Sequence, residues 1–100
     1  MDKYKVKVNP RVIRELDHIY EYIANEKLSP ENAKGQDARI KKAILSLDTF
    51  PQSNQERNEG RYAGTGYRQL IIDNYMAIFR IDEPRKIVYV VTIQYQRWNL

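Results

Sequence analysis

Two helix-start signals, Asn9-Pro10 and Ser29-Pro30, each precede a segment whose apolar residues recur with the period of an α-helix. Asparagine and serine cap helix N-termini, and proline suits the first turn because an N–H there has no partner within the helix. Since only a short connection separates the two segments, the helices must lie antiparallel as a helical hairpin.

Both helices are amphipathic, so each must turn its apolar side toward a common core. We expect the first helix to end near Lys27. The second should end at Pro51, because proline cannot continue a helix. The inward-facing residues expected of the first helix are Val12, Ile13, Leu16, Ile19, Tyr20 and Ile23, and those of the second are Ala33, Ile40, Ala43, Ile44 and Leu47.

Four other stretches have the pattern of β-strands. One precedes the helices and three follow a polar segment that we expect to be an exposed loop. A tight turn is predicted at Asp73-Asn74, because both residues tolerate left-handed backbone angles. The four expected strands are Tyr4–Val8, Tyr67–Ile72, Tyr75–Ile81 and Ile87–Tyr95.

This order of elements predicts a single α+β domain over residues 1–100. The helical hairpin is expected to pack on one face of a small antiparallel sheet and to leave the other face open. Side chains alternate between the faces of a strand, and this points Phe79 toward the helices and Arg80 toward the open face.

The chain carries a formal net charge of +4 and no cysteine. Residues 61–100 contain 6 basic and 3 acidic residues, so most of the excess positive charge lies in this part of the chain. A basic surface suits nucleic acid or an acidic partner, although charge also serves solubility alone. The missing cysteines exclude disulfides and thiolate metal sites, and neither a signal-peptide core nor a membrane-length apolar run occurs. We therefore expect a cytoplasmic protein with no membrane partner.

Three arginines, Arg68, Arg80 and Arg97, are expected to border one face of the sheet. Arginine forks hold phosphates, and aromatic rings stack on bases, so this set suits RNA or another phosphate-rich ligand. The alternative is that they are solvated arginines at sheet edges, with aromatic residues closing the core. The aromatic residues expected beside them are Tyr67, Tyr95 and Trp98.

Other chemistries have little support in the sequence. The one histidine, His18, falls in the middle of a helix, where a surface position is the simpler explanation. Asp17 and Glu21 lie one turn apart, as on a solvated helix face. Because the sequence has no phosphate-binding loop and no histidine- or cysteine-based ligand set, it predicts neither a metal nor another cofactor.

Four pieces of the chain carry a family resemblance: "ELDHIYEYIA", "SLDTFP", "YRQLIIDNYMAIFRID" and "KIVYVVTIQYQRWNL". In this order and spacing the chain resembles the RelE/ParE superfamily of bacterial toxin–antitoxin toxins over nearly its whole length. The resemblance implies a toxin that causes growth arrest and is neutralised by an antitoxin encoded beside it. Family antitoxins wrap the toxin with an extended, partly helical segment, and an acidic segment would suit this basic chain.

The resemblance implies two different targets. RelE-type members cut messenger RNA inside the ribosome, whereas ParE-type members act on DNA gyrase. Arg68 matches a basic position of RelE-type toxins, and Tyr95 and Arg97 match their C-terminal aromatic-or-histidine and arginine positions. Tyr95 would be a poor base, because the ordinary pKa of tyrosine is about 10.

One departure favours the ParE-like reading. Ribosome-dependent members usually carry an arginine where this chain has Met76, so Arg80 or Arg61 would have to replace it. We therefore favour a ParE-like toxin that binds gyrase. A ribosome-dependent endoribonuclease is the alternative, and a binding module of the same fold without toxicity is a third.

Overall fold

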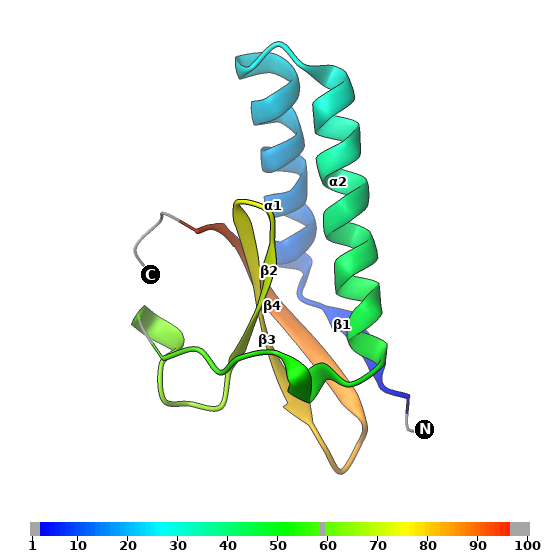
Figure 1. Ribbon diagram of the computed structural model, residues 1–100, viewed down its shortest axis with the longest axis vertical. Helices are drawn as coiled ribbons and strands as arrows, with labels where there is room; N and C mark the ends of the chain where they lie inside the picture. Colours follow the sequence, from blue (N-terminus) through cyan, green and yellow to red (C-terminus); the bar gives the residue numbers. More distant parts are fainter. Residues whose placement is uncertain (1–2, 59, 97–100) are drawn as a thin grey trace.

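The computed structural model describes residues 3–58 and 60–96, and within them it shows two helices packed on a four-stranded sheet (Figure 1). The helices are α1 (Pro10–Glu21) and α2 (Pro30–Leu45), and α1 continues into a π-helical turn, η1 (Tyr22–Glu26). The strands are β1 (Lys5–Val8), β2 (Arg68–Ile72), β3 (Tyr75–Asp82) and β4 (Ile87–Tyr95). Three short 3₁₀ turns are η2 (Ser46–Asp48), η3 (Pro51–Ser53) and η4 (Gly60–Tyr62).

The two helix starts differ in how they are capped. Asn9 accepts a hydrogen bond from the Arg11 N–H at 2.9 Å through its side chain, as a capping residue should. Ser29 precedes α2 but makes no side-chain capping bond, so that part of the prediction is wrong. Its backbone carbonyl still accepts from Ala33, and Pro30 begins the helix as expected.

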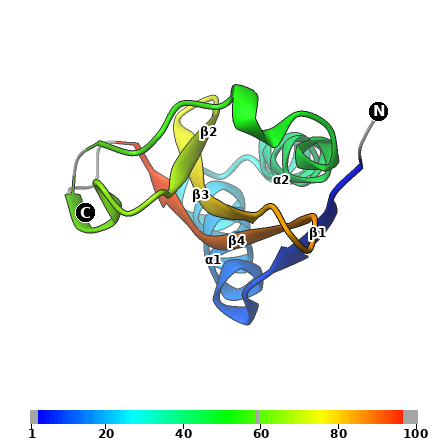
Figure 2. The same cartoon turned by 90° about the horizontal axis from the view of Figure 1, so that it is seen from below.

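The sheet has the strand order β1-β4-β3-β2 and is mixed rather than antiparallel. The last three strands form the predicted antiparallel meander, but β1 pairs in parallel with β4, from Lys5 with Ile87 to Val8 with Val90. Parallel neighbours need a long crossover, which the helical hairpin and the meander together provide. Figure 2 shows the two helices nearly end-on and the loop that carries η4 on the opposite side of the molecule.

The core lies between the helices and one face of the sheet, as the alternation of β3 predicted. Phe79 is fully buried there with Ala77 and Tyr75. The expected stripes of both helices are confirmed for most of their members. Ile23 and Ala43 are partly buried against the core, whereas Tyr20 is only half-buried and Ile13 is 55% exposed. The buried members of the stripes are Val12, Leu16, Ile19, Ala33, Ile40, Ile44 and Leu47.

The opposite face is not open at its centre, contrary to expectation. Met76 and Ile78 of β3 are buried, and so are Thr92 and Gln94 of β4. The loop before β2 folds back toward this face, where Arg57 Nη1 donates to Gln69 Oε1 at 2.8 Å. A bare apolar centre would expose a large hydrophobic patch, which folded proteins usually cover.

A polar cluster ties the β3–β4 turn to the start of the chain. The Tyr4 hydroxyl donates to Glu83 Oε2 at 2.8 Å, and Gln52 Nε2 donates to Glu83 Oε1 at 2.7 Å. Lys86 Nζ lies 3.4 Å from Glu83 Oε2. The bonds from Tyr4 and then Gln52 are the main causes that hold the pKa of Glu83 below its ordinary value.

Replacing Phe79 with alanine should open a cavity in this core. We expect Phe79→Ala to lower the free energy of unfolding by about 3–5 kcal/mol, measured by urea denaturation. The matched control is Ile71→Ala on the neighbouring strand, where the side chain is 49% exposed and the loss should be small. Equal losses in the two variants would contradict the placement of the core.

The hydrogen bonds to Glu83 should make the free energy of unfolding depend on pH in the acidic range. A lowered pKa in the folded state means that Glu83 contributes stability above its unfolded pKa of about 4.3, and that this contribution is lost as the pH falls below it. We expect Glu83→Gln to lose less stability than the parent chain between neutral pH and about pH 3. Tyr4→Phe removes the main donor and should flatten the same part of the profile. Profiles parallel to the parent's in both variants would show that the cluster does not hold the carboxylate.

Candidate functional site

Arg68 is part of the scaffold rather than a free cation. Its Nη1 donates to the carbonyl of Asn54 at 2.7 Å and to that of Gln52 at 3.3 Å. Its Nη2 lies 4.0 Å from Glu56, and the Arg68 side chain is 26% exposed. These contacts hold the segment after α2 against the first residue of β2.

Arg80 lies on the other face of the sheet. Arg68 pairs with Phe79 and therefore shares its face, whereas Arg80 is the next residue of β3 and points the opposite way. The Arg80 guanidinium stacks on the Tyr89 ring at 4.4 Å and is otherwise exposed. The expectation that Arg68 and Arg80 border one face of the sheet is thus wrong, because Arg68 pairs with Phe79 and not with Arg80.

The remaining predicted residues do not join Arg80. Tyr95 pairs with Tyr75 at the far end of β3, roughly 17 Å from Arg80 at the usual rise per strand residue. Tyr67 packs edge-on against Tyr62 at 5.0 Å, and Arg61 is exposed in η4. Arg97 and Trp98 lie outside the described residues. The catalytic or binding roles of the whole set stay predictions.

Arg57 is a candidate residue that was not predicted from the sequence. Its Nε is buried and, among the described residues, has no hydrogen-bond partner, while Nη1 holds Gln69 on the face away from the helices. An unpaired buried N–H of a cation costs free energy, so an arginine kept in this state is a candidate for holding an anion. Arg57 lies in a polar loop, and nothing in the surrounding sequence predicts that its Nε is buried.

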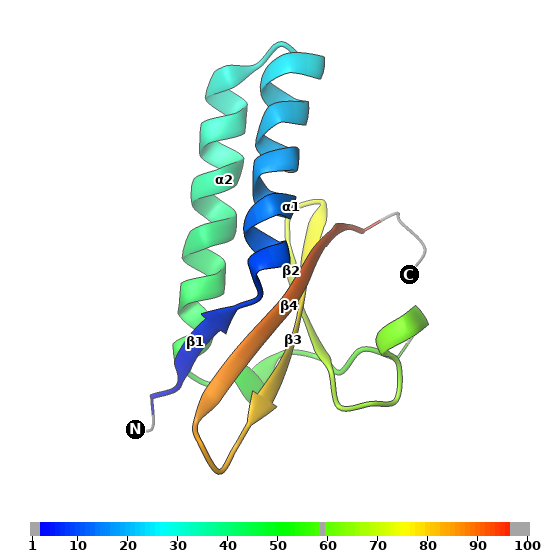
Figure 3. The same ribbon diagram turned by 180° about the vertical axis from the view of Figure 1, so that it is seen from behind.

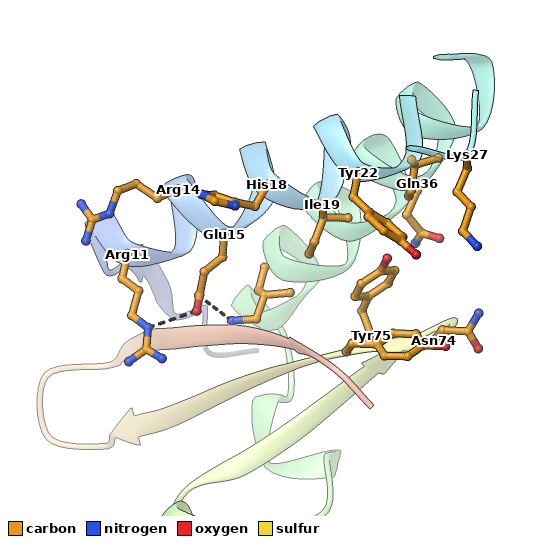
Figure 4. A pocket seen from close by; sticks show the side chains of 13 residues that line it. Arg11, Arg14, Glu15, His18, Ile19, Tyr22, Lys27, Gln36, Asn74 and Tyr75 are labelled. Carbon is orange, nitrogen blue, oxygen red and sulfur yellow. Dashed lines mark hydrogen bonds and ion pairs between the residues drawn. The ribbon is translucent and has the colours of Figure 1, made fainter. Parts of the chain in front are cut away.

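The described residues also form an open groove of about 970 Å³ between α1 and the end of β4 (Figure 4). Its apolar floor includes Ile19 and Ile93, which are buried, and Tyr95, which is half-buried. Its charged lining residues are Arg11, Arg14 and Lys27 against the single carboxylate of Glu15, with His18 beside them. Because three cations face one anion, the groove attracts negative charge.

Glu15 crosses from α1 to the edge of β4. Its Oε1 accepts the Ile93 N–H at 2.9 Å, and its Oε2 accepts from the Thr92 hydroxyl at 2.7 Å. Oε2 also accepts from Arg11 Nε at 3.0 Å. Figure 4 shows this side chain reaching down to the strand while Arg14 and His18 lie along the helix above.

Sequence reasoning missed Glu15, although a signal was present. The residue follows Val12 by three positions and precedes Ile19 by four, so it lies in the apolar stripe of α1. A carboxylate in such a stripe needs hydrogen-bond donors from the element that the helix covers. Donors on β4 could have been expected on that ground.

Tyrosines close the other end of the groove. Tyr75 and Tyr95 lie with ring centroids 5.6 Å apart, and Tyr22 of η1 faces Tyr75 across the groove (Figure 4). Burial, followed by the nearby Tyr95 and Tyr22, raises the pKa of Tyr75. A tyrosine whose pKa is raised stays neutral at physiological pH, so this end offers rings and hydroxyls rather than charge.

The family model for the ParE toxin of the type II toxin–antitoxin system parDE matches residues 6–99. The chain therefore belongs to the ParE toxin family of type II toxin–antitoxin systems. Among curated protein sequences, none is similar enough to count as a match.

Solved structures with the same fold include three from toxin–antitoxin systems. The chromosomal ParDE system of P. aeruginosa has a TM-score of 0.76 and 20% identity, with 93% of this chain and 96% of that one covered. The RelBE2 complex of Mycobacterium tuberculosis has a TM-score of 0.62 and 20% identity, covering 95% and 93%. The RelE–RelB complex of Pyrococcus horikoshii OT3 has a TM-score of 0.64 and 15% identity, covering 95% and 97%. At these identities the likeness shows the RelE/ParE-like fold.

Two arginines should respond differently to truncation. Arg68→Ala leaves two backbone carbonyls without their donor and should lower the free energy of unfolding by about 1–3 kcal/mol. Arg80→Ala removes an exposed stacking contact and should cost less than about 1 kcal/mol. Thermal or urea unfolding of the two purified variants measures the difference. A stable Arg68→Ala chain beside an unstable Arg80→Ala chain would reverse the assignment.

Proposed function

We propose that the chain is a cytoplasmic toxin that arrests growth by binding DNA gyrase, and that an antitoxin encoded beside it neutralises it. The family membership supports the toxin part. The gyrase part is supported by one observation: Arg68 and Arg80, the two described arginines of the predicted phosphate-holding set, lie on opposite faces of the sheet. Among the described residues, no helix is long and apolar enough to cross a membrane.

Messenger RNA cleavage would need fixed positive charges around one phosphate and a group that moves a proton. Arg68 and Arg80 point to opposite faces, and Arg68 is already bonded to two carbonyls. Met76, which stands where ribosome-dependent members carry an arginine, is 2% exposed. These features favour an action by binding over an action by cleavage.

The helical hairpin offers a surface for such binding. Figure 3 shows α1 and α2 projecting past the sheet, so that the turn joining them forms one end of the molecule. At this turn Leu28 is 84% exposed with a left-handed φ of 51°. Apolar side chains held in such a projecting position are typical of protein contacts, and the hairpin is the part that we assign to gyrase.

A RelE-like endoribonuclease is the second candidate. Arg57, whose Nε has no hydrogen-bond partner among the described residues, and the exposed Arg80 both belong to the face away from the helices. Arg57 could hold a phosphate there in place of the arginine that Met76 replaces. A binding module without toxicity remains the third reading.

One experiment in cells separates the three functions. The chain is induced briefly without an antitoxin, and messenger RNA ends and DNA breaks are mapped in the same sample. We expect DNA breaks and a damage response with intact messages. An Arg97→Ala chain produced at the same level should arrest growth less.

The other outcomes are equally clear. New cuts within translated codons and intact DNA would establish the endoribonuclease and overturn the gyrase proposal. Normal growth with abundant folded protein would leave only the binding module.

A further inference from the structure

Three strands carry a row of side chains across the face of the sheet that lies away from the helices. Lys7 of β1 pairs with Tyr89 of β4, and Tyr89 pairs with Arg80 of β3. Paired residues of neighbouring strands point their side chains to the same face, so these three lie side by side at intervals of about 4.8 Å. Lys5 is two residues before Lys7 and therefore shares this face. Figure 3 shows β1 running beside the first part of β4.

The cations of this row, Lys5, Lys7 and Arg80, are exposed. Within the described chain, neither lysine side chain makes an ion pair or a hydrogen bond. The acid of β3 that shares this face, Asp82, is already bonded to the next turn. Its Oδ1 accepts the Arg85 N–H at 3.2 Å, and its Oδ2 lies 3.9 Å from Arg85 Nε. The row therefore presents positive charge that no described carboxylate neutralises, and it attracts anions.

The guanidinium of Arg80 is held flat on a ring. It lies 4.4 Å from the centre of the Tyr89 ring, while the Arg80 residue as a whole is exposed. A planar guanidinium that rests on a ring with one face can meet another flat group with its second face. Nucleic-acid bases stack on guanidinium planes as they do on aromatic rings. The stack of Tyr89 and Arg80 can thus be extended by a base.

We propose that this basic row, formed by Lys5, Lys7, Tyr89 and Arg80, binds a single strand of nucleic acid. A base stacks on the Arg80 guanidinium, and the two lysines bind the phosphates beside that base. The site goes beyond the proposed function, since it requires neither gyrase nor the cleavage of messenger RNA. It also lies apart from Met76, which is four residues and so roughly 13 Å from Arg80 along β3.

The chemistry of the basic row favours a single strand over other polyanions. A base inside a duplex is stacked on its neighbours, so its flat face cannot reach a guanidinium on the surface of a sheet. The carboxylates of an acidic protein segment would pair with the lysines, but they offer no ring for the second face of Arg80. A single strand supplies both phosphates and unstacked bases.

Edge protection is the competing explanation for the lysines. β1 is the edge strand of the described sheet, and lysines on an edge strand prevent pairing with other sheets. This explanation does not involve Arg80, which lies two strands further in. It also predicts no binding that depends on bases, so a direct binding test separates the two explanations.

The test measures the affinity of the purified chain for a short dye-labelled strand of thymidylates by fluorescence anisotropy. We expect the logarithm of the affinity to fall with the logarithm of the salt concentration with a slope of about −1.4, because two lysines contact phosphates. Amide spectra recorded in the same titration should shift at Lys7, Arg80 and Tyr89, but not at Ile93 in the groove beside α1.

Matched variants separate charge from stacking. Lys7→Gln should weaken binding about threefold and reduce the salt slope to about −0.7. Arg80→Lys keeps the charge but removes the planar group, so it should weaken thymidylate binding at least about fivefold and leave binding of an abasic strand of the same length unchanged. Lys34→Gln removes one exposed charge of α2 outside the basic row and should bind like the parent chain.

Several results would overturn the proposal. No binding at low salt would leave edge protection as the role of the lysines. Equal losses in Lys7→Gln and Lys34→Gln would show that net charge alone attracts the strand, and equal affinity for the abasic strand would exclude the stack on Arg80. Tighter binding of a duplex or of a glutamate-rich peptide would assign the basic row to another partner.

These measurements are independent of the proposed function. They use the purified chain and an oligonucleotide, whereas the gyrase proposal is tested in cells by DNA breaks and message ends. Loss of binding in the variants would leave the gyrase proposal standing, and intact DNA in cells would leave the basic row standing.

Discussion

The parallel pairing of β1 with β4 sets the arrangement of the rest of the molecule. It lasts only four residues, because Asn9 and Pro10 then turn the chain into α1. The Asn9 N–H still bonds to the Val90 carbonyl, but Pro10 has no N–H to continue the ladder. One short strand thus anchors α1 over the sheet, and beyond Val90 no other described strand continues beside β4 on the side of β1.

Glu15 accepts the Ile93 N–H on the part of β4 that β1 does not reach. An unpaired N–H at a half-buried edge costs free energy, and the carboxylate on the second turn of α1 lies at the right height to accept it. The same carboxylate bonds to Arg11 and Thr92, so helix and strand are joined by charge-assisted hydrogen bonds as well as by apolar packing. The groove beside this contact keeps its basic character because, among the described residues that line it, Glu15 is the single acid beside Arg11, Arg14 and Lys27.

The arginines show how strongly tertiary context decides the role of a residue. Arg68, Arg80 and Arg57 carry the same side chain in three different situations. Arg68 is bonded to backbone carbonyls, Arg80 is stacked on a ring, and Arg57 has an Nε without a hydrogen-bond partner among the described residues. A guanidinium already bonded to the backbone has little capacity left for a ligand. This is why the proposed function depends on placement rather than on the number of basic residues.

The sequence by itself determined the two helices, the meander and the face of β3 that enters the core, because these follow from local signals: caps, prolines, turn residues and the periods of the apolar residues. Fully buried Phe79 lies where alternation put it. Only the tertiary structure decided which edge of the sheet β1 joins, since strand pairing between distant segments leaves no local mark.

The candidate site was less predictable for the same reason. Alternation placed Arg80 correctly, but the relation of Arg68 to Arg80 depends on the register between two strands, and a shift of one residue reverses a face. The contact of Glu15 with Ile93 joins residues 78 positions apart. A carboxylate within an apolar stripe can be read from the sequence, but its partner is chosen only when the helix packs on the strand.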